Sequence, residues 1–166
     1  MNVEIMDICL AGGTSPITLA SAVVLTVAEH LSGLVLAQSA RKGTSTLFGT
    51  CSTNLDMKTG TAPMASPENA LIASSVTQMA GYYNIPIRTG TGVSDGKIPD
   101  AQAGYEFAFN AFNLALAGAN IVWGAGCLDS GLGFDYAKLL MDHECVQNIG
   151  FFLRVSRWTM NSWLWS

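Results

Sequence analysis

RTGTGVSDGKIPDAQAGYE, residues Arg88 to Glu106, is the stretch that indicates the fold most directly. A short β-like run, Ile85 to Thr89, opens into a glycine-rich turn with several polar side chains, and the chain then passes through Pro99 into a helix. This strand–loop–helix order is typical of an α/β barrel, in which catalytic groups come from the carboxyl ends of the strands. The stretch therefore predicts the active-site edge of an enzyme, or the same edge in a barrel fragment.

The same order of elements recurs in four units, about 35 to 42 residues apart. Strands that alternate with long helices predict parallel βαβ units with right-handed crossovers. Four units are half of an eight-fold barrel, so the expected fold class is α/β, a partial (β/α)8 TIM barrel of about four βα units. The expected strands are Val3–Leu10, Thr46–Thr50, Ile85–Thr89 and Ile121–Ala125, and the expected helices are about Pro16–Arg41, Ser66–Gly81, Ala101–Ala117 and Phe134–Leu153.

Several helix ends can be predicted from local chemistry. Ser15 followed by Pro16 is a start signal, an N-cap with proline at the first helical position. Asp100 is expected to cap the third helix in the same way. Gly118 suits the left-handed residue that ends that helix.

The composition is unusually apolar, with 49% hydrophobic and only 12% charged residues. We expect that many surfaces meant for other protein segments are exposed in this chain. The apolar run Ile17–Ala37 is interrupted by polar side chains such as Glu29 and His30, whereas a membrane-spanning helix needs about 20 mostly apolar residues. No membrane role is therefore expected.

Charge and cysteine usage exclude other classes of partner. The net charge is −4 and the few basic residues are scattered, so nothing indicates nucleic-acid binding. Glu4 and Asp7 occupy the place where a signal peptide would be basic. The four cysteines form no CxxC pair and are expected to be free thiols in a reducing cytoplasm.

Several long motifs resemble the trimethylamine methyltransferase family. They run in order from about Leu10 to Arg154, which is more specific than a single short motif. The resemblance implies a piece of a large cytoplasmic (β/α)8 barrel whose other units are missing. The motifs are AGGTSPITLASAVVLTVAEHLSGLVLAQ, DMKTGTAPMASPENALIASSVTQMAGYYNIPIRTGTG, SDGKIPDAQAGYE, LAGAN and LDSGL.

Residues 155–166 depart from the pattern of the rest, because they hold three of the four tryptophans and show no apolar period. VSRWTMNSWLW can be back-translated into a DNA sequence that has a second meaning. If one G is restored in front of that DNA, the reading frame shifts and the DNA encodes GIEVDDELLAM. We hypothesise that residues 1–154 are a partial methyltransferase barrel and that 155–166 are an out-of-frame tail. The gene sequence tests this hypothesis.

The family's activity, as the resemblance implies it, is transfer of a methyl group from a methylated amine to the cobalt of a separate corrinoid protein. The implied cofactor is thus a corrinoid (cobalamin) carried by that partner, with no metal bound directly. Trimethylamine-specific members use pyrrolysine, and relatives without it use quaternary amines such as glycine betaine. Only ordinary residues stand in the segment Ser94–Asp100, which favours a quaternary amine.

A methylated ammonium must be held as a cation and shielded from water while the methyl group is attacked. Aromatic faces bind such cations, so Trp123 and Tyr105 are candidates for substrate binding, although Trp123 also suits a barrel layer. Asp95, Asp100 and Glu106 are candidates to pair with the cation or orient a water, and Asp95 is the better one because Asp100 also suits a helix cap. Asp95 and Lys97 are the predicted catalytic residues, and Lys97 could neutralise the carboxylate of a betaine or remain a solvated lysine.

The turn formed by Gly12, Gly13, Thr14 and Ser15 comes between a strand and a helix. Backbone N–H groups there could bind a carboxylate or phosphate, although a simple tight turn explains the same residues. Zinc is not expected, because adjacent helical residues such as Glu29 and His30 point about 100° apart.

Two other interpretations remain open. The chain could be a truncated, catalytically inactive half-barrel that self-associates through its exposed edges, and a homo-oligomer is expected in either case. It could also be an unrelated barrel enzyme that binds an anion at Gly12–Ser15.

Overall fold

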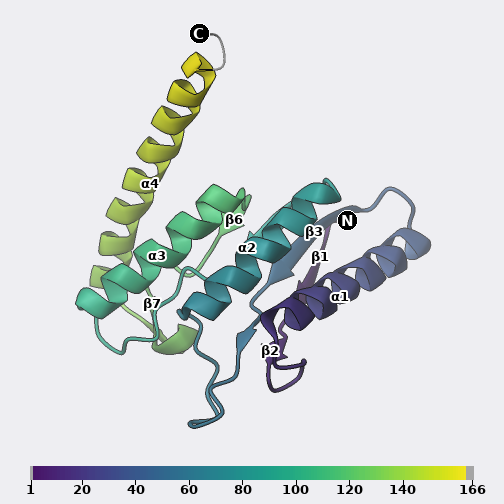
Figure 1. The fold of residues 1–166 in the computed structure, drawn as a ribbon, viewed down its shortest axis with the longest axis horizontal. Helices are drawn as coiled ribbons and strands as arrows, with labels where there is room; N and C mark the ends of the chain where they lie inside the picture. Colours follow the sequence, from purple (N-terminus) through teal and green to yellow (C-terminus); the bar gives the residue numbers. More distant parts are fainter. Residues whose placement is uncertain (1, 164–166) are drawn as a thin grey trace.

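The computed structural model describes the backbone of residues 2–163 and the side chains of residues 2–156. Its centre is a parallel sheet in the order β1-β3-β5-β6 (Figure 1), so each strand pairs with the next sheet strand along the chain. Val3 lies opposite Thr46, Phe48 opposite Ile87, and Thr89 opposite Val122. The strands are β1 Asn2–Asp7, β3 Ser45–Thr50, β5 Ile87–Thr89 and β6 Ile121–Val122.

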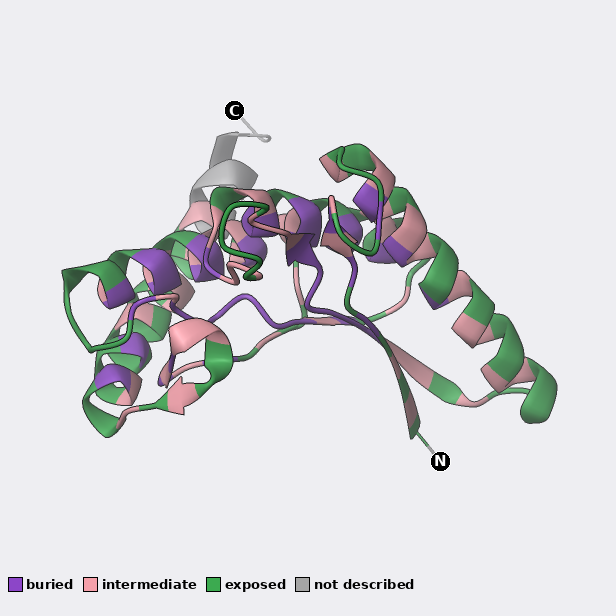
Figure 2. Cartoon of the chain, turned by 90° about the horizontal axis from the view of Figure 1, so that it is seen from below, coloured by how far each residue is buried: buried purple, intermediate pink, exposed green. Residues whose placement is uncertain are grey.

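Four helices follow the four sheet strands. The first three pack on one face of the sheet and the fourth packs against the third, whereas the other, concave face of the sheet is bare (Figure 2). The helices are α1 Leu19–Ala40, α2 Pro67–Tyr82, α3 Ala101–Ala117 and α4 Tyr136–Trp163. Two small strand pairs lie beyond the ends of the sheet strands. The first is parallel and joins β2 Leu10–Ala11 to β4 Thr53–Asn54. The second is antiparallel and joins β7 Cys127–Leu128 to β8 Gly133–Phe134, with the 3-10 turn η1 Asp129–Gly131 between them.

This arrangement confirms the α/β class and the repeated βα units. Sequential strand order with helices on one face is what consecutive units of a barrel produce. The described residues form an open sheet, so a closed barrel stays a prediction.

Local signals predicted some element ends correctly. Ser66 and Asp100 cap α2 and α3 by accepting hydrogen bonds from the backbone N–H groups of Asn69 and Ala103, at 3.1 and 3.2 Å. Gly118 ends α3 with φ of 92°, in the left-handed region. The expected bounds of α3, Ala101–Ala117, are confirmed.

The predicted start of the first helix is wrong. The helix begins at Leu19, where Thr18 Oγ1 accepts a hydrogen bond from Ser21 N at 3.3 Å. Ser15 instead closes a turn, because its N–H donates to the Leu10 carbonyl at 3.0 Å. The expected strand Val3–Leu10 is divided into two. The chain leaves the main sheet after Asp7, and Leu10 belongs to the short strand β2, which pairs with β4.

The last unit also differs from the prediction. The fourth strand ends at Val122, and the expected loop contains the β7–β8 hairpin. The helix begins at Tyr136 and continues to Trp163, past the predicted end at Leu153, because Arg154–Asn161 holds no glycine or proline to stop it. The expected boundary at 154/155 thus falls inside α4, residues 164–166 lie outside the described part, and the frameshift hypothesis stays a prediction.

The core lies between the sheet and the middle helices, as the buried segments of Figure 2 show. Phe48 and Ile87 of the sheet pack with Ile72 and Val76 of α2, and all four are at most 2% exposed. Burying side chains of this size contributes about 1.5 to 3 kcal/mol each. These four side chains therefore join β3 and β5 to α2 in one hydrophobic core.

Helix α1 is long and apolar enough to cross a membrane by length and composition alone. The same is true of many helices in the cores of soluble proteins. In this structure α1 packs on the sheet through Ala22, Thr26 and His30, all fully buried. The sheet-facing side of α1 is thus partly polar. Its Thr26 and His30 side chains make hydrogen bonds with Asp7 of β1 and Gly49 of β3.

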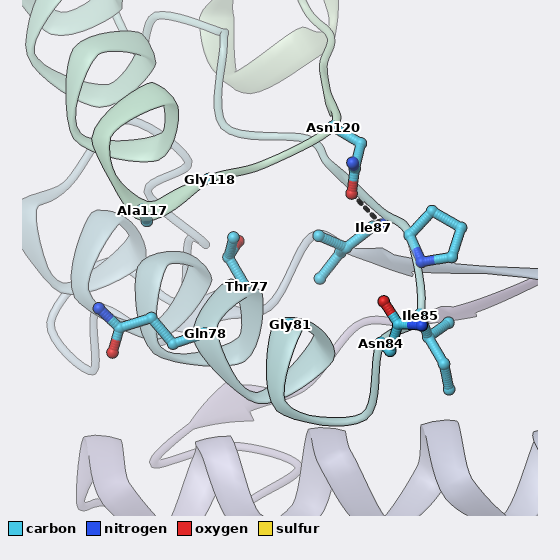
Figure 3. Close-up of a pocket in the computed structure, with 10 residues that line it drawn as sticks. Thr77, Gln78, Gly81, Asn84, Ile85, Ile87, Ala117, Gly118 and Asn120 are labelled. Atoms are coloured by element: carbon cyan, nitrogen blue, oxygen red, sulfur yellow. Dashed lines mark hydrogen bonds between the residues drawn. The ribbon is translucent and has the colours of Figure 1, made fainter. Parts of the chain in front are cut away.

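A pocket of about 530 Å³ lies at the amino end of β5, between the end of α2 and the α3–β6 connection (Figure 3). Asn120 anchors this connection, because its Oδ1 accepts a hydrogen bond from Ile87 N at 2.9 Å. The amino ends of barrel strands serve stability rather than catalysis. We therefore assign this pocket no catalytic role.

Two glycine substitutions test the end of α3. Added Cβ atoms at Gly118 and Gly81 would both meet open space, but only Gly118 has a positive φ. Gly118→Ala should lower the free energy of unfolding by about 1 kcal/mol, whereas Gly81→Ala, inside α2, should leave it unchanged or raise it. Urea denaturation followed by circular dichroism measures both, and equal effects would contradict the left-handed end.

Candidate active site

The segment that follows β5 lies at the carboxyl end of the sheet, where the loops after β3 and β6 also come together. From Thr89 to Ser94 every residue is buried, and the chain then reaches the surface at Lys97. Trp123 N donates to Thr89 O, and Gly92 N donates to Trp123 O, at 3.1 and 3.0 Å. These bonds extend the pairing of the two strands beyond their ends and fix where the polar loop begins.

Glu106 is a buried acid beside this loop, at 7% exposure. Its Oε2 accepts hydrogen bonds from Ser94 Oγ at 2.5 Å and from Asp95 N at 2.9 Å. Its Oε1 accepts one from Gln102 Nε2 at 2.8 Å. Glu106 thus holds the loop against the first turns of α3 through neutral donors only.

Asp95 joins three loops. Its Oδ1 accepts hydrogen bonds from Met64 N at 2.9 Å and Ser130 Oγ at 2.7 Å, and its Oδ2 accepts one from Ala65 N at 3.0 Å. Met64 and Ala65 immediately precede α2, and Ser130 lies in the β7–β8 hairpin. The geometry therefore gives Asp95 a positioning role, and its predicted contact with substrate stays a prediction.

A pocket of about 340 Å³ lies beside these two carboxylates. It is lined by both acids, by Tyr105 and Phe109 of α3, and by residues at the start of α2. Tyr105 is 64% exposed. Among the described side chains neither acid pairs with a lysine or arginine, so the pocket combines negative charge with aromatic surface.

Lys97 lies away from this pocket. It is exposed, and its Nζ is 3.8 Å from Asp129 Oδ1, a surface pair of little energetic weight. The structure therefore favours the solvated-loop interpretation of Lys97, and its predicted catalytic role is not supported by a neighbouring site residue. Asp100 acts as the cap of α3, as expected.

Trp123 belongs to a different cluster, on the concave face of the sheet. The guanidinium carbon of Arg88 lies 5.2 Å from the centroid of its ring. Arg88 Nε donates to Glu4 Oε1 at 2.5 Å, across the intervening strand β3. A Cβ at Gly90 would lie 2.9 Å from ring atoms of Trp123, so only glycine leaves room for this ring.

Three backbone N–H groups of the turn Gly12–Ser15 already have acceptors within residues 10–15. Gly12 N donates to Ser15 O, and Gly13 N and Ser15 N both donate to Leu10 O. Thr14 Oγ1 accepts a hydrogen bond from Leu10 N at 2.9 Å. Because α1 begins only at Leu19, its positive end is also several residues away. These contacts favour the tight-turn interpretation, and the predicted binding of substrate by Gly12–Ser15 stays a prediction.

Asp7, at the end of β1, is the centre of a buried polar network. Its Oδ2 accepts hydrogen bonds from Thr26 Oγ1 at 2.8 Å and from Ser52 Oγ. His30 Nε2 donates to the Gly49 carbonyl at 2.8 Å and lies 2.9 Å from Asp7 Oδ1. Burial raises the pKa of Asp7, but the hydrogen bonds from His30, Ser52 and Thr26 outweigh it and leave the pKa below its usual value.

The same network bears on the prediction that no metal binds directly. Asp7, Cys9 and Glu29 each offer a ligand atom, and these atoms lie within 4.8 Å of one another. However, Asp7 is already held by protein donors, and burial raises the pKa of the Cys9 thiol, which disfavours the thiolate. We therefore treat the cluster as a structural link between β1, α1 and the loop after β3.

Comparison with known proteins relates this geometry to a family. A model of the family described as trimethylamine methyltransferase (MTTB) matches residues 1–164. Trimethylamine methyltransferase MttB of Desulfitobacterium hafniense (strain DSM 10664 / DCB-2) is 46% identical over 147 residues, 89% of this chain and 30% of the relative. MttB of Methanosarcina thermophila is 40% identical with the same coverage. Glycine betaine methyltransferase of D. hafniense (strain Y51) is 41% identical over 143 residues, 86% of this chain and 30% of the relative.

Fold and loop edge together define the chain as an α/β protein built from consecutive βα units. The family model matches almost the whole length of the chain, and the chain therefore belongs to the trimethylamine methyltransferase family. This confirms the resemblance that the motifs predict. The chain spans about 30% of the length of the curated relatives it matches.

Several residues of these clusters were not predicted from the sequence. Arg88 and Glu4 are 84 residues apart and meet only because β1 and β5 flank the same strand. Ser130 joins the Asp95 site through a hairpin that the sequence did not reveal. The one available signal was Glu4 itself, a charged residue inside an apolar strand.

Substitution of Asp95 tests its role in joining the loops. Asp95→Ala removes the acceptor of two backbone N–H groups and a hydroxyl, and it should lower the free energy of unfolding by about 2 kcal/mol. Asp56→Ala is the matched control, because the Asp56 carboxylate also accepts loop hydrogen bonds, from Lys58 N and Thr59 Oγ1, but on the surface. Urea denaturation that places both variants at the same midpoint would contradict the positioning role.

The lowered pKa of Asp7 predicts how stability depends on pH. A carboxyl whose pKa is lowered on folding stabilises the protein above its unfolded pKa, about 3.9, and this contribution is lost as the pH falls through the folded pKa. The stability difference between wild type and Asp7→Asn should therefore be constant from about pH 5 to 7 and shrink below about pH 4. Denaturant titrations across this range measure it, and a difference that grows toward acid would contradict the assignment.

Proposed function

We propose that this chain is part of an enzyme that transfers a methyl group from trimethylamine, or from a quaternary amine such as glycine betaine, to a corrinoid protein. The observation that carries the proposal is the 40–46% identity to trimethylamine and glycine betaine methyltransferases over 86–89% of the chain. A cytoplasmic location and a cognate corrinoid-carrying partner are parts of the same proposal. When bound, the corrinoid supplies the nucleophile that accepts the methyl group.

The protein's own task is to hold a cation and to exclude water. Of the two predicted aromatic residues, Trp123 already has the Arg88 guanidinium over its ring. Tyr105 instead lines a pocket with Asp95 and Glu106, and its side chain is largely exposed. An aromatic face beside two carboxylates attracts a methylated ammonium without needing a specific hydrogen bond. These contacts favour the Tyr105 pocket over Trp123 as the cation site.

The acids of that pocket are preorganised by neutral donors. Glu106 and Asp95 accept three hydrogen bonds each, so neither has to reorient when a cation arrives. Loss of the methyl group turns the cationic substrate into a neutral amine product. The negative pocket therefore binds the product less strongly than the substrate. This difference would assist release of the demethylated amine.

Methyl transfer to free cob(I)alamin tests the function. The 166-residue chain and a version extended to the length of the relatives should each be assayed with trimethylamine and with glycine betaine, following cob(I)alamin absorbance. We expect transfer by the extended version, and absence of transfer with either amine would overturn the proposal. Activity confined to the extended version would agree with an inactive chain on its own.

Tyr105→Leu in the extended version tests the cation site. Loss of one cation–π contact, about 0.5 to 2 kcal/mol, should lower kcat/KM by roughly 2- to 30-fold. Tyr82→Leu, an exposed tyrosine near the end of α2, should leave kcat/KM unchanged. An effect of Trp123→Leu on KM without any effect of Tyr105→Leu would reverse the assignment.

A further inference from the structure

The turn between β7 and β8 has a strained backbone. Asp129, Ser130 and Gly131 all have positive φ, of 51°, 56° and 92°. Glycine adopts this left-handed region readily and aspartate tolerates it, but serine is uncommon there. Strain of this kind persists only where the surrounding contacts hold it, and it is found most often at functional sites. The contacts of this turn therefore indicate what the strain serves.

Three hydrogen bonds tie the turn to the loop after β5. Asp129 N donates to the Gly96 carbonyl at 2.9 Å, and Ser130 N donates to the Ser94 carbonyl at 3.0 Å. The third comes from a side chain, since Ser130 Oγ donates to Asp95 Oδ1 at 2.7 Å. The two backbone bonds need no particular side chain in the turn, whereas the third needs a side-chain donor at position 130.

The residue type at position 130 agrees with this third bond rather than with the backbone. Glycine would adopt the positive φ without strain, as Gly131 does at the next position. A glycine at position 130 would keep the backbone bonds of the turn, but it would offer Asp95 no hydroxyl. The strained serine thus stands at the point where the turn donates a side-chain hydrogen bond to Asp95.

The bond from Ser130 affects how Asp95 can be used. Its Oδ1 accepts hydrogen bonds from Met64 N and Ser130 Oγ, and its Oδ2 accepts one from Ala65 N. A carboxylate has about four acceptor positions, two on each oxygen. Donors from the described residues therefore fill Oδ1 and leave one position on Oδ2. Asp95 also lines the pocket that contains Tyr105, so this position is available to a partner there.

We propose that Ser130 is a positioning residue for the pocket of Asp95 and Tyr105, and that the strained turn serves to hold its hydroxyl on Asp95 Oδ1. With this bond the carboxylate is fixed from two sides, by the β7–β8 hairpin and by the loop before α2. Without it, only the loop before α2 holds the carboxylate. The effect of Ser130 on cation binding rests on the proposed function, whereas its effect on Asp95 does not.

Backbone amide exchange, followed by NMR on the 166-residue chain, tests the effect on Asp95. Ser130→Gly suits the positive φ but has no side-chain donor. It should speed exchange of the Met64 and Ala65 amides roughly 10-fold, because their acceptor loses one of its supports. Ser130→Asn also suits this φ and offers a side-chain N–H to Asp95, so exchange should stay near the wild-type rate.

Asp129→Gly is the matched control. Asp129 lies in the same turn with a positive φ, but its carboxylate is 3.8 Å from Lys97 Nζ on the surface. This variant should leave the Met64 and Ala65 amides at the wild-type rate. Equal effects of the two glycine variants, no effect of Ser130→Gly, or no rescue by Ser130→Asn would each overturn the proposal. Faster exchange of the buried Ile72 amide in α2 as well would assign Ser130 to the whole fold and overturn it too.

Methyl transfer by the extended version tests the effect on cation binding. Ser130→Gly should raise KM for the methylated amine roughly 3- to 10-fold with little change in kcat, because Asp95 would act on binding, and Ser130→Asn should restore KM. An active wild type whose KM Ser130→Gly leaves unchanged would overturn the placement of Ser130 at this site. An inactive wild type would instead overturn the proposed function, and amide exchange would still decide the role of Ser130.

Discussion

The carboxylate of Asp95 is the group on which the arrangement of the loop edge depends. Parallel strands bring all their following loops to one edge of the sheet, but strand pairing alone does not hold those loops together. Asp95 accepts hydrogen bonds from the loop before α2 and from the β7–β8 hairpin. The backbone N–H groups of Met64 and Ala65 would otherwise lack an acceptor just before a helix start. Its charge thus organises three segments that the sheet merely brings close.

Glu106 completes this arrangement from the helix side. It binds the backbone N–H of Asp95, while the Asp95 side chain binds the neighbouring loops. The two acids therefore form a chain of contacts that runs from α3 through the β5 loop to α2. Because hydrogen bonds to a charged group are stronger than those between neutral groups, this chain can hold an irregular loop without a buried apolar core.

What the sequence predicted well was local. Ser66 and Asp100 begin their helices, and Gly118 ends one, by contacts with residues at most four positions away, so each signal is complete in a short stretch. Ser15 carries the same signal but has a competing partner, since its backbone closes a turn on Leu10. Long-range contacts were not predictable in this way. The meeting of Glu4 with Arg88 depends on strand order, and the role of Asp95 depends on where two other loops fold.

The cluster of Glu4, Arg88 and Trp123 on the concave face shows how the strength of a contact depends on water. In this structure the Arg88 and Glu4 side chains are 25% and 35% exposed, and an ion pair so close to water contributes little. Covering the concave face would remove that water and strengthen both the ion pair and the contact of Arg88 with Trp123. The weight of the contacts that Arg88 makes with Glu4 and Trp123 therefore depends on how far water reaches this face of the sheet.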